Sequence, residues 1–228
     1  MTKKKSLETQ NPAPRRNKKT DTREKILEAA KKIFAEHPYS TASIRMVGNA
    51  AGIDHPLISY YYPTKADLFE AVLEEISETY YQANTAWFEG LEALSLSIGL
   101  SLYIDRMLDF ISEHAETLRI VALNLAQPED SKIVPGYRQM QLLLTRNTET
   151  FRKMTTLRGS AREARMFTES FNALVINYLG AATFYAGNLG MNPQGPAYRK
   201  WVKETLMLLF LPWLRQLIRG DTQIRPRP

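Results

Sequence analysis

The chain has 228 residues, of which 44% are hydrophobic, and this length and composition can bury one large core or two small ones. It contains no cysteine, which excludes disulfides, Cys-based zinc sites and thiol nucleophiles, and which is expected of a protein in the reducing cytoplasm. Residues 1–20 hold seven lysines and arginines against one glutamate, which accounts for the whole net charge of +6, so a basic arm precedes a body of balanced charge.

The arm, residues 1–20, is predicted to be disordered because it is polar, contains two prolines and shows no hydrophobic periodicity. It lacks the apolar stretch of a signal peptide. The longest strongly apolar run, 206–214, is too short for a membrane span of about 20 residues, so we expect no membrane partner. Two interpretations of the arm stay open, a solubilising tail and an arm that reaches a DNA groove.

The first predicted helix begins at Thr22, from where hydrophobic residues recur at helical spacing. It is expected to end at His37, because the residue before a proline such as Pro38 avoids helical backbone angles. A second, short helix is predicted after Ser43, whose side chain can cap it. This helix is expected to end at Gly52, which tolerates the positive φ of a tight turn.

Two further helices follow after short connections. Asp54 can cap the third helix, and Pro56 then falls in its first turn, where a missing N–H is harmless. Tyr62, near the end of this helix, is expected to be buried. The fourth helix begins at Thr64, which forms the outline of a capping box with Asp67.

Beyond about residue 80 the pattern is helical and nowhere alternates as a strand would, so the predicted fold class is all-α. The helices are expected to pause near Gly90, near His114, at 127–135, at 158–160 and at 187–196.

The second and third helices, joined by a glycine turn inside a three-helix unit, are typical of a helix-turn-helix. In that motif the first helix braces the second, which lies in the major groove of DNA. Helical hairpins that bind no DNA also carry a glycine, so by spacing alone a purely structural motif stays open.

Residues 22–30, 41–53 and 60–68 resemble the N-terminal domain of the tetracycline-repressor (TetR/AcrR) family, a resemblance that covers about residues 20–78. It implies a ligand-responsive repressor that binds a palindromic operator in double-stranded DNA as a two-fold homodimer and is released by a small effector. The expected domains are a basic arm (1–20), a helix-turn-helix DNA-binding domain (21–80), a helical effector-binding and dimerisation domain (81–218) and a flexible tail (219–228).

The same resemblance implies a set of DNA contacts. Lys65 takes the position of a lysine that binds a phosphate at a helix N-terminus. The matched or exposed positions are Thr22, Ser43, Arg45, His55, Pro56, Leu57, Ser59, Tyr60, Tyr61 and Lys65.

Four of these positions depart from the family pattern, one of them Ser59, where the family frequently has an aromatic residue. The family commonly has Lys-Gly where this chain has His55 and Pro56, and a small or polar residue where it has Leu57, which can read a thymine methyl. The departures affect the expected operator sequence and leave the expected fold unchanged.

The second domain is expected to enclose a ligand pocket, and its aromatic residues favour a lipophilic or aromatic effector. Helical spacing alone equally fits core residues. Candidate polar anchors include Asn172, and the candidate ligand-binding residues are Trp87, Tyr103, Met107, Phe110, Arg119, Asn124, Phe151, Asn177 and Tyr178.

Two long apolar segments, 161–186 and 197–218, are expected to form the dimer interface as a four-helix bundle. Gly180, followed by two alanines, would let two backbones approach closely. The alternative is that these residues are only intramolecular core. The candidate interface residues are Phe167, Phe171, Leu174, Val175, Leu208 and Trp213.

Other function classes find little support in the sequence. The chain has three histidines without metal-binding spacing and no glycine-rich phosphate loop, so no catalysis, metal or cofactor is expected. The alternative function is a ligand-sensing or dimerisation module that does not bind DNA. In the favoured mechanism the fourth helix, about 64–81, transmits effector binding, with a coupling of about 1–3 kcal/mol.

Overall fold

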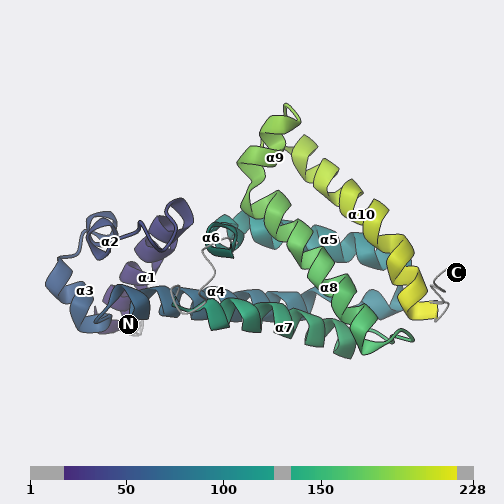
Figure 1. Cartoon of the computed structure of the whole chain (residues 1–228), viewed down its shortest axis with the longest axis horizontal. Coiled ribbons are helices and arrows are strands. Elements are labelled where there is room, and N and C mark those ends of the chain that lie inside the picture. Colours follow the sequence, from purple (N-terminus) through teal and green to yellow (C-terminus); the bar gives the residue numbers. More distant parts are fainter. Residues whose placement is uncertain (1–17, 126–134, 220–228) are drawn as a thin grey trace, which may run out of the picture.

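The computed structural model describes residues 18–125 and 135–219, and within these ranges all regular structure is helical. Helices α1 (Lys18–Glu36), α2 (Ile44–Ala51) and α3 (His55–Tyr61) form a small domain at one end of the long axis (Figure 1). No described helix has both the length and the hydropathy that a membrane span requires.

The second domain contains the helices from residue 91 onward. They are η1 (Leu91–Ala93), α5 (Leu96–Glu113), α6 (Ala115–Leu125), α7 (Tyr137–Met154), α8 (Ala161–Val175), the π-turn η2 (Ile176–Gly180), α9 (Ala182–Asn188) and α10 (Pro196–Arg219). Helices α5, α8 and α10 outline a triangle in Figure 1, and α10 packs on both of the others. The predicted pauses at Gly90, His114 and 158–160 fall between helices, and that at 187–196 overlaps the end of α9 and the first residue of α10. Most of 127–135 lies outside the described residues.

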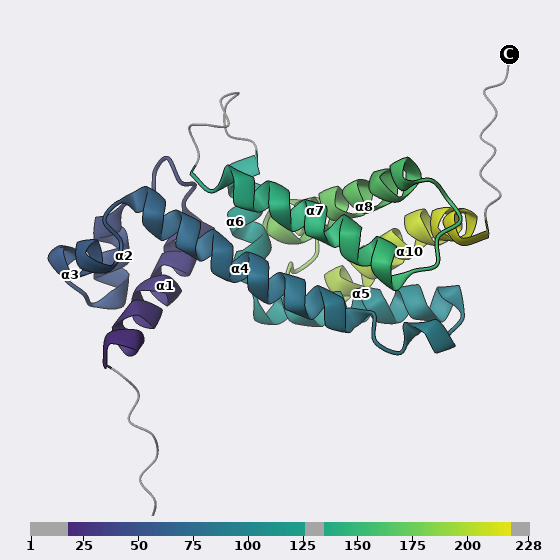
Figure 2. The same ribbon diagram turned by 90° about the horizontal axis from the view of Figure 1, so that it is seen from below.

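Helix α4 (Lys65–Trp87) joins the two domains without a linker. It leaves the small domain, where Leu68 and Phe69 are buried, and runs beside α7 in the second domain (Figure 2). The expected boundary at residue 80 therefore falls inside a continuous helix, and Tyr80 itself is buried.

Two other boundaries differ from the sequence expectation. Helix α1 begins at Lys18 rather than Thr22, so the last residues of the predicted arm are helical and the others lie outside the described residues. The segment 161–186 is interrupted by η2, where the chain presses against α6 and the regular helical hydrogen bonding changes.

Close packing explains why η2 contains Gly180. An added Cβ there would lie 2.6 Å from the carbonyl oxygen of Leu118 and 2.8 Å from the Cβ of Ala122, both on α6. The close backbone approach expected at this glycine is therefore present, but the neighbour is a helix of the same chain.

Candidate nucleic-acid interface and ligand cavity

The α2–α3 unit has the local geometry of a helix-turn-helix. The Ser43 Oγ accepts a hydrogen bond from the Met46 amide at 3.3 Å and caps α2, and Gly52 ends the helix with a φ of 64°. Asp54 precedes α3 as its N-cap residue but its side chain makes no capping bond, and Pro56 lies in the first turn. The predicted turn chemistry is confirmed except for the Asp54 side chain.

Gly48 lies inside α2, where glycine lowers the helix propensity, and packing explains its presence. A Cβ at Gly48 would lie 2.8 Å from the Ile53 carbonyl oxygen, which belongs to the turn between the two helices. A side chain here would push the turn outward, so this glycine lets α2 and α3 meet closely.

Helix α3 buries one face and exposes the other. Ile58 is fully buried and Tyr62, as expected, is only 4% exposed. On the outer face Leu57 is 44% and Tyr60 67% exposed, a large apolar exposure for so short a helix. His55 is exposed as well, with its Nδ1 3.4 Å from the Ser59 hydroxyl.

The other predicted DNA contacts are distributed around this face. Arg45 and Pro56 are exposed, while Thr22, Ser43, Ser59 and Tyr61 are half-buried. The Tyr61 ring packs edge-on against Tyr60 with their centroids 5.2 Å apart. The contacts of these residues with DNA stay a prediction.

Lys65 has intramolecular partners that the sequence did not reveal. Its ammonium donates hydrogen bonds to the carbonyl oxygens of Tyr39 at 2.7 Å and Ala42 at 2.9 Å, and lies 4.3 Å from the centre of the Tyr39 ring. Burial lowers the pKa of this ammonium. Lys65 therefore fixes the loop between α1 and α2, and its contact with a phosphate stays a prediction.

Replacement of Lys65 by methionine, which keeps the aliphatic stem, is expected to lower the free energy of unfolding by about 1 kcal/mol, since two partly exposed hydrogen bonds are lost. Affinity for all duplexes should fall alike, and the slope of log K against log salt should decrease by about one unit. Urea unfolding and a salt titration of DNA binding measure the two effects, with exposed Lys153→Met as control. Unchanged stability would contradict the loop contacts, and an unchanged slope the phosphate contact.

Asn124 links the two domains. This α6 residue is 0% exposed, and its Oδ1 accepts a hydrogen bond from the Tyr39 amide at 2.9 Å while its Nδ2 donates to the Ile120 carbonyl at 2.8 Å. The sequence suggested Asn124 as a ligand anchor. In the structure its side chain instead bridges α6 and the α1–α2 loop. Its amide oxygen and its amide nitrogen are both hydrogen-bonded to backbone groups.

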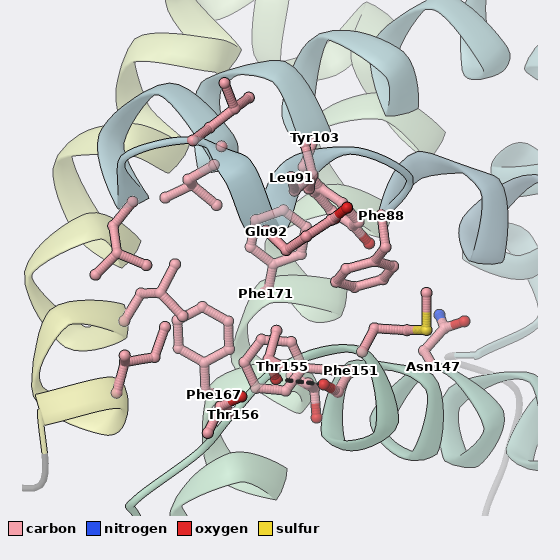
Figure 3. A pocket seen from close by; sticks show the side chains of 18 of the residues that line it. Phe88, Leu91, Glu92, Tyr103, Asn147, Phe151, Thr155, Thr156, Phe167 and Phe171 are labelled. Atoms are coloured by element: carbon pink, nitrogen blue, oxygen red, sulfur yellow. Dashed lines mark hydrogen bonds between the residues drawn. The ribbon is translucent and has the colours of Figure 1, made fainter.

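A cavity of about 310 Å³ lies in the second domain, between η1, α5, α7, α8 and α10. Figure 3 shows the rings of Phe88, Phe151, Phe167 and Phe171 around this space. The wall is completed by Leu91, Glu92, Leu94, Ser95, Leu96, Gly99, Leu100, Tyr103, Asn147, Met154, Thr155, Thr156, Thr168, Asn172, Leu214 and Ile218. Its size is at the lower end of the range for small-molecule pockets.

Two of the nine predicted ligand residues, Tyr103 and Phe151, line this cavity. Three others do not line the cavity. Trp87 and Met107 belong to the hydrophobic core, and Phe110 packs against it. The sequence pattern could not separate these groups because core and cavity wall share the same helical periodicity.

The remaining predicted ligand residues also lie away from the cavity. Arg119 is exposed on α6. Asn177, also exposed, donates its Nδ2 hydrogen bond to the Ala173 carbonyl at 2.7 Å, and the carbonyl of Tyr178 accepts from the Tyr198 hydroxyl at 2.6 Å. Both belong to η2, which packs against α6.

A hydrogen-bonded row of side chains borders one end of the cavity. The Tyr103 hydroxyl donates to the Asn84 Oδ1 at 2.7 Å, the Asn84 Nδ2 donates to the Asn147 Oδ1 at 3.3 Å, and the Asn147 Nδ2 donates to the Asn172 Oδ1 at 3.5 Å. Burial raises the pKa of Tyr103 well above its ordinary value, so its hydroxyl is a neutral donor. The Asn172 Nδ2 ends the row, buried and without an acceptor.

Half of the predicted dimer residues are core residues of this chain. Phe167, Phe171 and Val175 are at most 6% exposed, and the Phe167 ring stacks on Phe151 at 5.1 Å. They face inward because the inner side of α8 closes the cavity. Of the others, Leu174 and Trp213 are half-buried, and Leu208 is 76% exposed on α10.

Comparison with known proteins agrees with this geometry. The family described as "Bacterial regulatory proteins, tetR family" matches residues 26–72. The HTH-type transcriptional repressor AcnR of Corynebacterium glutamicum is 37% identical over 59 residues, 26% of this chain and 31% of that protein. The HTH-type transcriptional repressor NicS of Pseudomonas putida is 31% identical over 77 residues, 34% of this chain and 36% of that protein. The chain spans about a third to a half of the length of the curated relatives it matches.

Solved structures extend the likeness to the second domain at the level of the fold alone. A TetR transcriptional regulator from Legionella pneumophila has a TM-score of 0.60 at 18% identity, covering 81% of this chain and 96% of that one. The transcriptional regulator FadR from Bacillus subtilis, solved in complex with stearoyl-CoA, has a TM-score of 0.57 at 15% identity, covering 82% and 98%. The helix-turn-helix is thus similar in sequence to the tetR family of bacterial regulatory proteins over residues 26–72, and the arrangement of the helices is similar to that of solved regulators of this fold.

Proposed function

We propose that this protein is a ligand-responsive transcriptional repressor that binds a palindromic operator as a two-fold dimer and acts without catalysis or cofactor in the cytoplasm. The observation that carries the proposal is the outer face of α3, which exposes His55, Leu57 and Tyr60 beside a capped and closely packed α2. A protruding helix with exposed apolar and hydrogen-bonding side chains suits the major groove.

The position of each exposed residue indicates its proposed role in DNA binding. The exposed side of α3, the proposed reading helix, carries His55, Leu57 and Tyr60. Leu57 offers an apolar contact for a thymine methyl. Arg45 lies in the first turn of α2, where a phosphate is within reach of a long side chain. The arm at residues 1–20 would add attraction to DNA that is independent of sequence.

The dimer would form through the outer faces of α8 and α10. Met166 is 49% exposed on α8, and Leu208 and Leu209 are 76% and 49% exposed on α10, which packs beside α8. These residues replace the buried Phe167, Phe171 and Val175 as proposed interface residues. A two-fold dimer places two reading helices on half-sites about 10 base pairs apart.

A continuous set of contacts connects the cavity with the small domain of α1, α2 and α3, which we call the reading head. Helix α8 lines the cavity and continues into η2, η2 packs on α6, and Asn124 of α6 holds the Tyr39 amide. Lys65 of α4 holds the carbonyl of the same Tyr39. An effector that moves α8 would thus reach the α1–α2 loop through α6, in addition to the route through α4.

Selection from random DNA duplexes tests the function. The purified chain is expected to enrich a palindrome, and Leu57→Ala is expected to change the preferred base at one position in each half-site. Gln82→Ala, exposed on α4 away from this surface, should select the wild-type motif. Absence of any enriched sequence would favour the alternative, a ligand-sensing or dimerisation module that does not bind DNA.

A further inference from the structure

The described residues of the cavity wall carry almost no charge. Among the described residues that line it, Glu92 is the only charged one, and this glutamate lies in η1 and is exposed rather than buried. No lysine, arginine or histidine is among those lining residues. A carboxylate or phosphate inside would lose its hydration without gaining a cation, which costs several kcal/mol.

Five aromatic rings, those of Phe88, Tyr103, Phe151, Phe167 and Phe171, form part of the cavity wall beside aliphatic side chains. The Phe151 and Phe167 rings are stacked at an interplanar angle of 13°, and Phe171 continues the stack at 12° to Phe167. Phe88 contributes a further ring, tilted against Tyr103. The space holds roughly ten water molecules, and its walls favour a flat apolar body.

The hydrogen bonds at the polar end of the cavity all run in one direction. Each member of the row Tyr103–Asn84–Asn147–Asn172 donates to the next, so the row ends in a donor rather than an acceptor. Asn172 is 8% exposed and lines the cavity, yet its Nδ2 has no acceptor among the residues that the structure describes. A buried amide N–H without a partner is costly, and a chain of aligned hydrogen bonds polarises its last donor.

Neighbouring hydroxyls already have acceptors. Thr168 donates to the carbonyl of Ala164 at 3.1 Å, and Thr155 donates to the carbonyl of Phe151. The Asn172 amide is therefore a donor in this wall that a ligand can satisfy.

We infer that the effector is an uncharged, flat apolar molecule that carries a carbonyl-type hydrogen-bond acceptor, and that the Asn172 Nδ2 donates to this acceptor. The inference rests on the proposed function only in calling the bound molecule an effector. The exposed Glu92 carboxylate, and the absence of a cation among the described residues of the wall, select against anionic acids of the same shape.

Calorimetric titration of the full chain with three probes tests this chemistry. Acetylnaphthalene carries the acceptor, ethylnaphthalene replaces it by a hydrocarbon, and naphthoate replaces it by an anion at the same ring position. The ketone is expected to bind about tenfold tighter than the hydrocarbon, as one satisfied buried donor implies, and naphthoate more weakly than either. Equal affinity of ketone and hydrocarbon, tighter binding of naphthoate, or no binding of the ketone up to its solubility would overturn the inference.

Asn172→Leu removes the donor at nearly constant volume. It should lower the affinity for acetylnaphthalene about tenfold while leaving that for ethylnaphthalene within about twofold. The control Asn188→Leu, on an exposed asparagine of α9, should keep the wild-type preference. A preference for the ketone that persists in Asn172→Leu contradicts the assignment of this residue, and the ranking of the probes by the wild-type chain decides the chemistry even if the variant does not fold.

The outcome is separable from the proposed function. A chain that enriches a palindrome but ranks the probes differently is a DNA-binding regulator with another ligand chemistry. A chain that ranks the probes as expected but enriches no DNA keeps this ligand site without the repressor function.

Discussion

Replacement of Gly180 by alanine is expected to lower the free energy of unfolding by about 2 kcal/mol, the cost of overpacking a tight contact. The new methyl group would lie 2.6 Å from the Leu118 carbonyl oxygen and 2.8 Å from the Ala122 Cβ. One of these atoms is backbone, so η2 and α6 must move apart. Urea unfolding measures the loss as a lower midpoint at constant slope.

The control for this substitution is Gly187→Ala. Gly187 is also helical, in α9, but an added Cβ meets no atom within 4 Å. Alanine has the higher helix propensity, so this variant should be unchanged or up to about 1 kcal/mol more stable. Similar losses for both variants would show that the contact between η2 and α6 is loose rather than close-packed.

Replacement of Asn124 by leucine is expected to lower the free energy of unfolding by about 2 kcal/mol and to weaken the response of DNA binding to an effector. Leucine keeps the volume but leaves the Tyr39 amide, now bonded at 2.9 Å, without an acceptor in a buried contact. Hydrogen exchange at the Tyr39 amide should become faster. The ratio of operator affinities without and with a ligand that releases the wild-type chain should move toward one.

Asn177→Leu is a matched control for this prediction. Its Nδ2 also donates to the carbonyl four residues earlier, at 2.7 Å, as the Asn124 Nδ2 does, but Asn177 is exposed and holds no amide of the other domain. Stability and effector response should stay near wild type. A full effector response in Asn124→Leu would exclude α6 as the route between cavity and reading head.

Local features of the fold could be predicted from the sequence because their causes act over a few residues. Ser43, Gly52 and Thr64 occupy the cap positions that their side chains or backbone freedom favour, and the capping box of Thr64 with Asp67 forms both of its bonds. The burial of Tyr62 and the exposure of Tyr60 follow equally from helical spacing.

Contacts between distant segments could not be predicted in the same way. The bond between Tyr39 and Asn124 joins residues 85 positions apart, and no local pattern marks either partner. Phe167 and Phe171 repeat with the spacing of any apolar helix face, which is the same for a dimer interface as for a cavity wall. The sequence suggested Asn172 as a polar anchor. The hydrogen-bonded row that ends at its Nδ2 depends on three side chains from other helices.

The continuity of α4 constrains how this protein can be recombined with its relatives. Its 23 residues span about 35 Å and are shared by both domains. A chimera that takes its reading head from one regulator and its second domain from another must be joined within this helix. One inserted residue would turn the two parts by about 100° relative to each other and advance them by about 1.5 Å. Exchange of heads should therefore succeed at junctions that conserve the residue count between Leu68 and Tyr80, and fail when a single residue is added or removed there.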